Sequence, residues 1–376
     1  MCGRLNKAMY GTRDAAKNWE YEYVEWLMSI GFVSGRASPC VFYHAVKGLR
    51  LMVHGDDFTI LGYEQDLDWF RRQISDKYEV KFRGRIGPDA NDEKSIRILN
   101  RVVEWTENGL RNEADQRHAD LIAKKLGFED GSNSVVTPGE KREVKEEEGE
   151  EQELRGADAT LFRALVARAN YLAQDRTDIA FAVKELCRRM SCPREGDWKG
   201  LKRLGRYLVD KRRLICEFKY QYKPAKVVVW VDTDHAGCKE TRKSTSGGLI
   251  KLGDHAFKGW SVTQGVIALS SGEAEFYGIV KGSSVGMGIQ SVLGDMGFKL
   301  KLQVLIDSSA AKGIASRRGL GKVRHIEVHQ LWVQEKVADG SIELNKVSGK
   351  ANLADALAKH VGRQILERHF EATNQR

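Results

Sequence analysis

The clearest pattern along the chain is an apolar strand sequence that ends in an acidic residue. Residues 227–231 read Val-Val-Val-Trp-Val, and Asp232 follows them shortly before the run breaks at a glycine. Residues 302–306 are again mostly apolar, and Asp307 follows them. Short β-branched and apolar runs bounded by turn residues are typical of buried strands. The sequence therefore predicts two strands that each end in a carboxylate.

Two helical segments carry further acids. Residues 269–278 place Glu273 and Glu275 at the start of a predicted helix, and residues 352–358 place Asp355 among small apolar residues. Packed into one fold, these carboxylates would repel one another unless divalent cations lay among them. Mg²⁺ or Mn²⁺ suits such oxygen ligands, and two ions can activate a water and stabilise the leaving oxygen of a phosphodiester.

The sequence leaves open which glutamate joins the cluster. Residues two apart on a helix point to different sides, so only one of Glu273 and Glu275 can reach the same ions. Gly278 follows Glu275 by about one turn, and a small residue there suits a helix that lies close to a sheet. This favours Glu275, with Glu273 as the alternative.

The rest of the pattern indicates an α/β and α+β chain with several segments. Asp56 and Asp57 form the turn of a hairpin between apolar strands, and a charged run without apolar periodicity predicts a linker. The predicted segments are a first folded unit at 1–139, an acidic linker at 140–157, a helical connection at 158–225, a mixed five-stranded sheet with flanking helices at 226–362 and a C-terminal tail at 363–376.

Composition adds a bias in charge. The 376 residues include 61 Lys and Arg against 52 Asp and Glu, a net charge of +9, which fits a polyanionic partner. The 41% hydrophobic and 30% charged residues are typical of globular proteins. The six cysteines form no C-x-x-C pair, which favours reduced thiols over disulfides or a zinc site. No apolar run reaches membrane-spanning length.

The C-terminal motifs resemble the ribonuclease H domain of copia-type LTR retrotransposons. They occur in the family's order: Asp232-Thr-Asp-His-Ala-Gly-Cys, Arg242-Lys-Ser-Thr-Ser-Gly-Gly248, Ala268-Leu-Ser-Ser-Gly-Glu-Ala-Glu-Phe-Tyr277, Ile306-Asp-Ser-Ser-Ala-Ala311, Arg324-His-Ile-Glu-Val-His329 and Leu353-Ala-Asp-Ala-Leu-Ala-Lys359. The resemblance implies a ribonuclease H-like sheet and cleavage of RNA in RNA–DNA hybrids. It also implies a metal-binding quartet of Asp232, Glu273 or Glu275, Asp307 and Asp355.

The N-terminal part, residues 1–139, resembles a partial palm and thumb of the copia-type reverse transcriptase. Tyr10-Gly-Thr-Arg-Asp-Ala-Ala-Lys-Asn-Trp19 matches its template-and-nucleotide motif, and His54-Gly-Asp-Asp-Phe58 stands where the family has Tyr-Val-Asp-Asp. The resemblance implies Asp56 as a metal ligand with Asp57 beside it. The strand that bears the family's other essential aspartate, and the fingers, would precede residue 1. We therefore expect a Pol fragment whose polymerase region is incomplete and inactive by itself.

The same resemblance implies an RNA–DNA hybrid as partner, together with the remaining Pol segments. Basic residues would contact phosphates: Lys239, Arg242, Lys243, Arg317, Arg318, Lys322, Lys202 and Arg206. His325 and His329 lie four apart, but the first is not followed by the glutamate of zinc metalloproteases. We expect these histidines to be structural or to face the substrate.

Two other interpretations stay open on the sequence. One is a retroelement relic whose fold persists without activity, and the other is a module that binds nucleic acid without cleaving it. Cleavage that depends on Mg²⁺ would argue against both. The expected location is the cytoplasm, a virus-like particle or the nucleus.

Overall fold

The computed structural model describes residues 8–9, 11–129, 131–141, 152–321, 323 and 325–376. The chain divides into two units, of which the first is Met1–Arg83 with Met287–Leu300 and the second is Gly84–Gly286 with Lys301–Arg376. Most of the predicted acidic linker, at 142–151, lies outside the described residues. The prediction of a mixed α/β chain with several sheets is confirmed.

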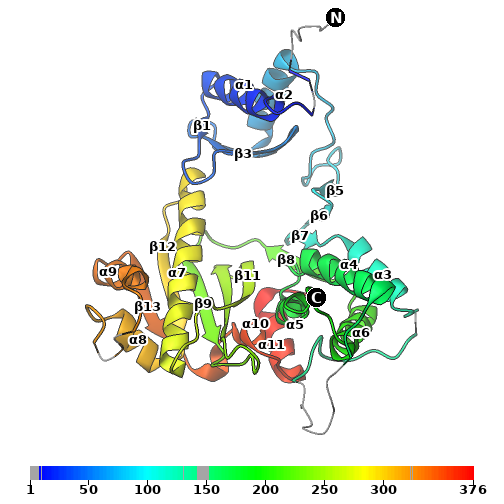
Figure 1. The fold of residues 1–376 in the computed structure, drawn as a ribbon. Coiled ribbons are helices and arrows are strands. Elements are labelled where there is room, and N and C mark those ends of the chain that lie inside the picture. Colours follow the sequence, from blue (N-terminus) through cyan, green and yellow to red (C-terminus); the bar gives the residue numbers. More distant parts are fainter. Residues whose placement is uncertain (1–7, 10, 130, 142–151, 322, 324) are drawn as a thin grey trace, which may run out of the picture. The chain divides into compact units, whose positions relative to one another are not determined.

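The first unit has a four-stranded antiparallel sheet of order β1-β2-β3-β4. Leu49, Leu51 and Val53 alternate along β3 and are buried, as the period of a half-buried strand predicts. They pack against aromatic and aliphatic residues of the two helices, which cover this face of the sheet (Figure 1). The elements are α1 (Ala15–Ser29), β1 (Val33–Ser34), β2 (Val41–His44), β3 (Leu49–His54), β4 (Asp57–Leu61) and α2 (Glu64–Lys77).

The second unit begins with another antiparallel sheet, of order β5-β6-β7-β8. Its strands are β5 (Ser95–Ile98), β6 (Arg101–Thr106), β7 (Gly109–Glu113) and β8 (Ile215–Lys219). The prediction of a helical connection through 158–225 is wrong at β8. This segment completes the edge of β7, and Arg111 of β7 pairs with Glu217 of β8 at 3.1 Å. A partner strand about a hundred residues away leaves no trace in a local pattern.

The predicted helical connection otherwise consists of helices packed around one core. Leu165, Val166, Leu201 and Leu204 are among its fully buried residues. Arg176 lies buried beside this core, and its Nη2 is 2.7 Å from Asp178 Oδ2. The elements are α4 (Gly156–Leu172), η1 (Thr177–Ile179), α5 (Ala180–Cys187) and α6 (Glu195–Asp210). The helix α3 (Gln116–Lys125), from the segment predicted at 1–139, packs against the same core.

The C-terminal part of the second unit is built on a five-stranded mixed sheet of order β11-β10-β9-β12-β13. The strand β10 is antiparallel to both β11 and β9, whereas β12 runs parallel to both β9 and β13. This is the arrangement expected of a ribonuclease H-like sheet. The strands are β9 (Lys226–Thr233), β10 (Thr245–Leu252), β11 (His255–Thr263), β12 (Lys301–Ile306) and β13 (Ile342–Lys346).

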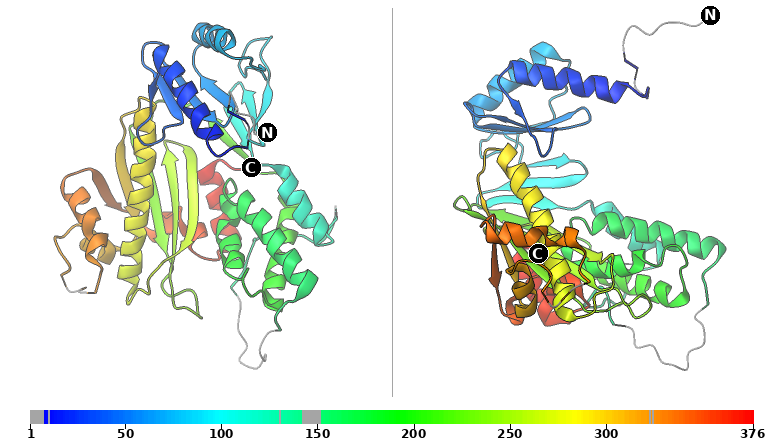
Figure 2. Two further views of the ribbon diagram at one scale, coloured as in Figure 1. Left: turned by 45° about the horizontal axis from the view of Figure 1, so that its top comes forward. Right: turned by 60° about the vertical axis from the view of Figure 1, so that its left-hand side comes forward.

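The part of the long helix α7 (Ser271–Asp295) that ends at Gly286 runs along one face of this sheet (Figures 1 and 2). Glycines spaced four apart permit the close approach. A Cβ on Gly278 would lie 2.9 Å from Val231 Cγ1, and one on Gly282 would lie 2.5 Å from Val231 Cγ2. Real Cβ atoms do not come so near, so larger residues would push the helix away from β9.

The short helix α10 packs against the opposite face of the sheet. Asp232 and Gly247 are paired across β9 and β10 and so share a face, and a Cβ on Gly247 would lie 2.5 Å from the Leu357 carbonyl carbon. Asp232 and Val231 are adjacent on a strand and point to opposite faces. The remaining elements are α8 (Ser309–Ala315), η2 (Val328–Leu331), α9 (Trp332–Ala338), η3 (Gly349–Ala351), α10 (Asp355–Ala358) and α11 (Arg363–Thr373).

The segment predicted only as a C-terminal tail contains α11 and is anchored at His369 and at its last residue. His369 of α11 is buried, with Nε2 2.8 Å from Thr177 Oγ1. The carbonyl of Arg376 accepts from the Ile215 backbone N–H at 2.8 Å. Among the described helices, none has the length and apolar character needed to cross a membrane.

Candidate active site

Three carboxylates meet where β9 ends. Asp232 is the last residue but one of β9, Glu275 lies near the start of α7, and Asp307 directly follows β12. One oxygen of each carboxylate lies within 4.8 Å of the corresponding oxygens of the other two. Because β9 and β12 are parallel neighbours, their carboxyl ends lie at one edge of the sheet. The two strand-end acids therefore meet there, and α7 adds the third.

The fourth predicted acid, Asp355, is linked to this group through a lysine. Asp355 begins α10, and Lys359 Nζ lies 2.9 Å from Asp355 Oδ1 and 3.2 Å from Asp232 Oδ2. Asp355 is not one of the three residues whose oxygens lie within 4.8 Å. Nothing in the sequence pattern assigns Lys359 to the site, because the contact with Asp232 crosses from the end of α10 to the sheet.

Burial and repulsion raise the pKa values of two of these acids. Burial raises the pKa of Asp232 to about 7, with Asp355 and Asp307 adding to the rise and the Lys359 ammonium opposing it. Burial likewise raises the pKa of Glu275 to about 8, with Asp232 and Asp307 as further causes. Such shifts arise where negative charges are gathered with little water and too few cations.

Glu273 and Glu275 occupy different surroundings. The Glu273 side chain is 1% exposed, and its Oε2 accepts from the Leu269 backbone N–H at 2.9 Å. The same oxygen lies 2.7 Å from His325 Nε2. The structure thus places Glu275 with the clustered acids and Glu273 in a contact with the segment that carries His325. The helical period separates the two side chains, as the sequence indicated.

The clustered side chains suit divalent cations. Glu275 Oε2 is buried and has no hydrogen-bond partner among the described residues. The acidic group therefore contains a buried acceptor whose hydrogen-bonding capacity is not satisfied. Carboxylate oxygens are the ligands that Mg²⁺ and Mn²⁺ prefer. The residues that could hold such ions are Asp232, Glu275 and Asp307, with Asp355 beside them.

Asp56 and Asp57 lie at the turn between β3 and β4 in the first unit. Asp56 is exposed, and the turn is fixed by Gly55, which has φ +64° and accepts from Trp19 Nε1 at 2.8 Å. Asp57 pairs with Arg83 at 3.0 Å. In the part of the chain that the structure describes, no third His, Cys, Asp or Glu joins these two acids as a cluster of possible metal ligands.

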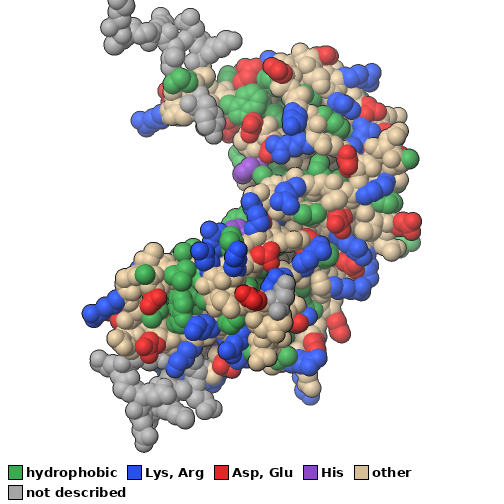
Figure 3. Space-filling model, turned by 90° about the vertical axis from the view of Figure 1, so that its right-hand side faces the viewer, with side chains coloured by type: hydrophobic (Ala, Val, Ile, Leu, Met, Phe, Trp, Pro, Cys, Tyr) green, Lys and Arg blue, Asp and Glu red, His purple; other side chains and the backbone are tan. Residues whose placement is uncertain are grey.

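The predicted phosphate contacts differ in exposure. The exposed ones are Lys239, Arg242, Arg318, Lys202 and Arg206, the partly buried ones are Lys243 and Arg317, and Lys322 lies outside the described residues. Two have protein partners, since Arg206 stacks 5.8 Å from the Phe128 ring centroid and Arg317 donates to the Leu320 carbonyl. On the face shown in Figure 3, Lys and Arg side chains are interspersed with Asp and Glu.

The loop between β9 and β10, which carries Lys239 and Arg242, is held by residues that follow α5. Arg188 Nη2 donates to Cys238 Sγ, and Arg189 Nη1 lies 2.6 Å from Glu240 Oε2. No local sequence pattern indicates these contacts, because basic residues at a helix end usually face solvent. They fix a loop that comes directly after Asp232.

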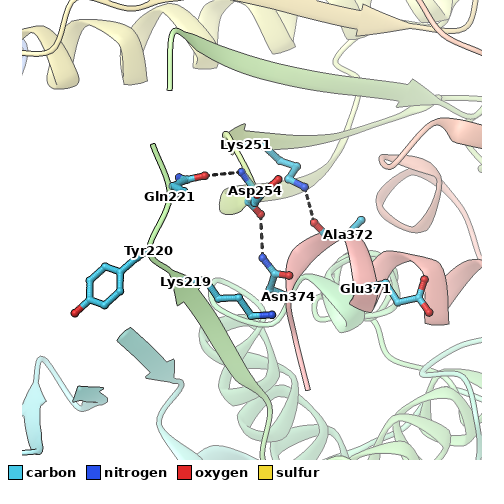
Figure 4. Close-up of a pocket in the computed structure, with 8 residues that line it drawn as sticks. All are labelled: Lys219, Tyr220, Gln221, Lys251, Asp254, Glu371, Ala372 and Asn374. Atoms are coloured by element: carbon cyan, nitrogen blue, oxygen red, sulfur yellow. Dashed lines mark hydrogen bonds between the residues drawn. The ribbon is translucent and has the colours of Figure 1, made fainter. Parts of the chain in front are cut away.

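A separate pocket of about 220 Å³ lies between the end of β8, the β10–β11 hairpin and α11 (Figure 4). Its polar groups are engaged in packing: Lys251 Nζ donates to the Ala372 carbonyl at 2.8 Å, and Asn374 Nδ2 donates to the Asp254 carbonyl at 3.0 Å. None of the clustered carboxylates lines it. We therefore assign the pocket to the docking of α11.

Comparison with known proteins finds similarity along nearly the whole chain. The chain is 26% identical over 371 residues to the retrovirus-related Pol polyprotein from transposon RE1 of Arabidopsis thaliana, covering 97% of this chain and 24% of that protein. It is 24% identical over 378 residues to the corresponding polyprotein from transposon TNT 1-94 of Nicotiana tabacum, covering 98% and 28%. The chain thus spans about a quarter of the length of these curated relatives. No family model matches.

Among solved structures, the foamy viral protease-reverse transcriptase in complex with an RNA/DNA hybrid aligns with 95% of this chain and 41% of its own. The TM-score is 0.49 and the identity 10%.

Proposed function

We propose that residues 226–362 act as a metal-dependent ribonuclease on the RNA strand of RNA–DNA hybrids, because the chain is similar over nearly its whole length to retrovirus-related Pol polyproteins of plant transposons. The observation that carries the proposal is the group of Asp232, Glu275 and Asp307, whose oxygens lie within 4.8 Å of one another. Isolated buried carboxylates are costly, and a group of them is retained where cations or protons compensate the charge.

The four acids have distinct structural supports in this proposal. Asp232 and Asp307 are fixed by parallel strands, Glu275 by a helix that glycines allow close to the sheet, and Asp355 by the start of α10. Together they would hold two Mg²⁺ or Mn²⁺ ions, which supply an activated water and neutralise the leaving 3′-oxygen of a phosphodiester. Elements of regular structure position the ligands more exactly than loops do.

Basic residues around the site would position the hybrid. Lys239 and Arg242 lie on the loop that follows Asp232, and Arg317 and Arg318 follow α8. Contacts to phosphates orient a nucleic acid without reading its sequence, and contacts to 2′-hydroxyls distinguish the RNA strand from DNA. We infer a preference for the hybrid over duplex DNA with little dependence on base sequence.

The first unit is proposed to contribute the palm of a polymerase without polymerase activity in this chain. Asp56 and Asp57 lie on one hairpin, and among the described residues no third ligand gathers with them. Polymerases hold two metal ions with acids from more than one segment. The remaining segments of Pol are the expected partners of this unit.

The test uses the purified full chain and a labelled RNA–DNA hybrid. We expect the RNA to be cut with Mg²⁺ or Mn²⁺ and left intact with EDTA, while a DNA duplex of the same sequence is not cut. Asp307→Asn removes charge, preserves shape and should abolish cutting without loss of folding. Glu335→Gln, at an exposed acid on α9, is the matched control. A folded Asp307→Asn protein that cuts as fast as the wild type would overturn the proposal.

The same variant separates cleavage from binding. If the chain only binds nucleic acid, Asp307→Asn and wild type should bind the hybrid alike, and neither should cut it. If it is a ribonuclease, Asp307→Asn should retain binding and lose cutting. Fluorescence anisotropy with the hybrid, measured beside the cleavage assay, gives both values.

A further inference from the structure

Lys359 lies between two of the four carboxylates, 2.9 Å from Asp355 Oδ1 and 3.2 Å from Asp232 Oδ2. Its position follows from the fold. The helix α10 is one turn long, and the Lys359 backbone N–H donates to the Asp355 carbonyl at 3.2 Å. Lys359 directly follows the helix in an extended conformation, and its side chain returns to the acid that begins the helix.

The three side chains differ in their access to solvent. The side chains of Asp232 and Asp355 are 4% and 13% exposed, whereas that of Lys359 is 45% exposed. A lysine carries its ammonium on a flexible four-carbon stem. The ammonium can therefore move into water while the two carboxylates stay in place.

The positive charge of Lys359 is secured by its neighbours. Burial alone would lower the pKa of Lys359, but the Asp232 and Asp355 carboxylates raise it above its ordinary value. Arg368 also lies near Asp355, but its Nη2 is 3.9 Å from Asp355 Oδ2, and its Nη1 donates to the Lys350 carbonyl. Of the two cations, Lys359 is the nearer and the one that also reaches Asp232.

We propose that Lys359 is an internal counter-cation of the site: its ammonium holds Asp232 and Asp355 together before divalent cations bind, and it withdraws toward solvent when they bind. This inference rests on the proposed function, because it takes the carboxylates to be metal ligands. Lys359 is then a positioning residue for the metal-free site and a competitor of the ions for the same oxygens.

A neutral residue at this position should have two opposite effects. Without the ammonium, Asp232 and Asp355 are left near each other with little compensation, so the metal-free protein should unfold at a lower temperature. With no ion pair to break and no like charge beside the ions, divalent cations should bind more tightly. If the lysine had only a structural role, its replacement would lower the unfolding temperature without tightening the binding of divalent cations.

The test is calorimetric titration of the full chain with MnCl₂, combined with thermal unfolding in EDTA. Lys359→Met should tighten Mn²⁺ binding by roughly three- to tenfold, a range typical of a partly exposed charge. It should also lower Tm in EDTA and enlarge the rise in Tm on adding Mn²⁺. Lys359→Arg keeps the charge and should stay near the wild type. Lys226→Met is the matched control, since Lys226 pairs with Glu343 at 2.7 Å on the same sheet.

The outcomes separate this inference from the proposed function. A folded Lys359→Met protein with wild-type Mn²⁺ affinity overturns the role of the lysine, even where the wild type binds the ion and cuts RNA. A wild-type chain that binds neither Mn²⁺ nor Mg²⁺ overturns both.

The wild-type chain supplies a second measurement if Lys359→Met does not fold. In ¹⁵N-lysine-labelled protein, the side-chain signal of Lys359 is identified by its loss in Lys359→Arg. In EDTA it should show the slow proton exchange of an ion-paired ammonium, and adding Mg²⁺ should shift it to the position of a solvated lysine. A signal that does not respond to Mg²⁺ binding overturns the proposal.

Discussion

Glu273 and Glu275 lie two residues apart on α7 and face different partners. Glu273 Oε2 is 2.7 Å from His325 Nε2, whereas an oxygen of Glu275 gathers with those of Asp232 and Asp307 within 4.8 Å. The separation follows from the helical period, which turns residues two apart to different sides. Each glutamate therefore has its own testable role.

Glu275→Gln should lower hybrid cleavage by roughly two to three orders of magnitude, the size of a lost electrostatic contact in a catalytic site. Glu273→Gln should be mild, because the amide oxygen can still accept from the Leu269 backbone N–H. Initial rates of RNA cutting at saturating Mg²⁺ measure both. The opposite ranking would show that the clustered glutamate is not the one that acts.

The glycines of α7 give a prediction that is independent of catalysis. Gly282→Ala should destabilise the protein by about 1–3 kcal/mol, because the added Cβ would lie 2.5 Å from Val231 Cγ2 in a packed interface. Gly288→Ala, on the same helix, meets nothing within 4 Å and should stabilise it by about 0.5–1 kcal/mol through helix propensity. Urea unfolding of the two variants beside the wild type measures the difference. Equal effects would mean that α7 does not lie against β9 as described.

The same helix shows what the sequence could predict. Gly278 indicated a close approach of helix and sheet, and the apolar runs before Asp232 and Asp307 indicated strands. These signals are local, because a strand is recognised from the spacing of its own apolar residues. A helix that packs closely is likewise recognised from its own small residues. Parallel pairing of β9 and β12 then brings the two strand ends together.

Other features depend on partners that are distant in the chain. The strand β8 exists because β7 offers it an edge, and the pair of Arg111 and Glu217 is recognised only once that pairing is known. Lys359 reaches Asp232 across 127 positions of sequence, and Arg188 reaches Cys238 across 50. Such contacts depend on the topology of the fold, so no local periodicity in the sequence predicts them.

Stability should depend on pH through His369. Burial lowers the pKa of His369, while its contact with the Leu353 carbonyl and the charge of Asp178 oppose the shift. The folded protein therefore keeps this histidine neutral at a pH where the same histidine in the unfolded chain, with a pKa of about 6.5, takes up a proton. The stabilisation is full above that pKa and falls as the pH drops, by at most about 1.4 kcal/mol per pH unit.

Urea unfolding between about pH 7.5 and pH 5 measures this dependence. As the pH falls across that range, the stability of the wild type should drop relative to that of His369→Asn, because the variant lacks the group that takes up the proton. The raised pKa values of Asp232 and Glu275 act in the opposite direction, but they do so in both proteins. His329→Asn is the control, since that side chain is 68% exposed and should not change the slope. Burial alone would raise the pKa of Asp178, but Arg176 lowers it below the ordinary value. Asp178 therefore contributes to the pH dependence of stability in a lower pH range. Parallel slopes for wild type and His369→Asn would contradict the assignment.

The last prediction concerns the first unit, where Asp56 and Asp57 lie at the turn between β3 and β4. Asp57 is engaged by Arg83 at 3.0 Å, and among the described residues no third acid, histidine or cysteine gathers with the pair. Polymerisation needs two ions clamped between the attacking and leaving oxygens, and two adjacent acids on one hairpin offer few ligands for the second.

We therefore expect no primer extension when the full chain is given dNTPs, Mg²⁺ and a primed RNA template, even where it cuts the RNA of a hybrid. Asp56→Asn should leave that cutting unchanged, because Asp56 belongs to a different unit from the clustered carboxylates. Gel analysis of one reaction with a labelled primer and a labelled template reports both activities. Templated extension that Asp56→Asn abolishes would prove the prediction wrong, since it would require another part of the chain to supply the further ligand that two ions need.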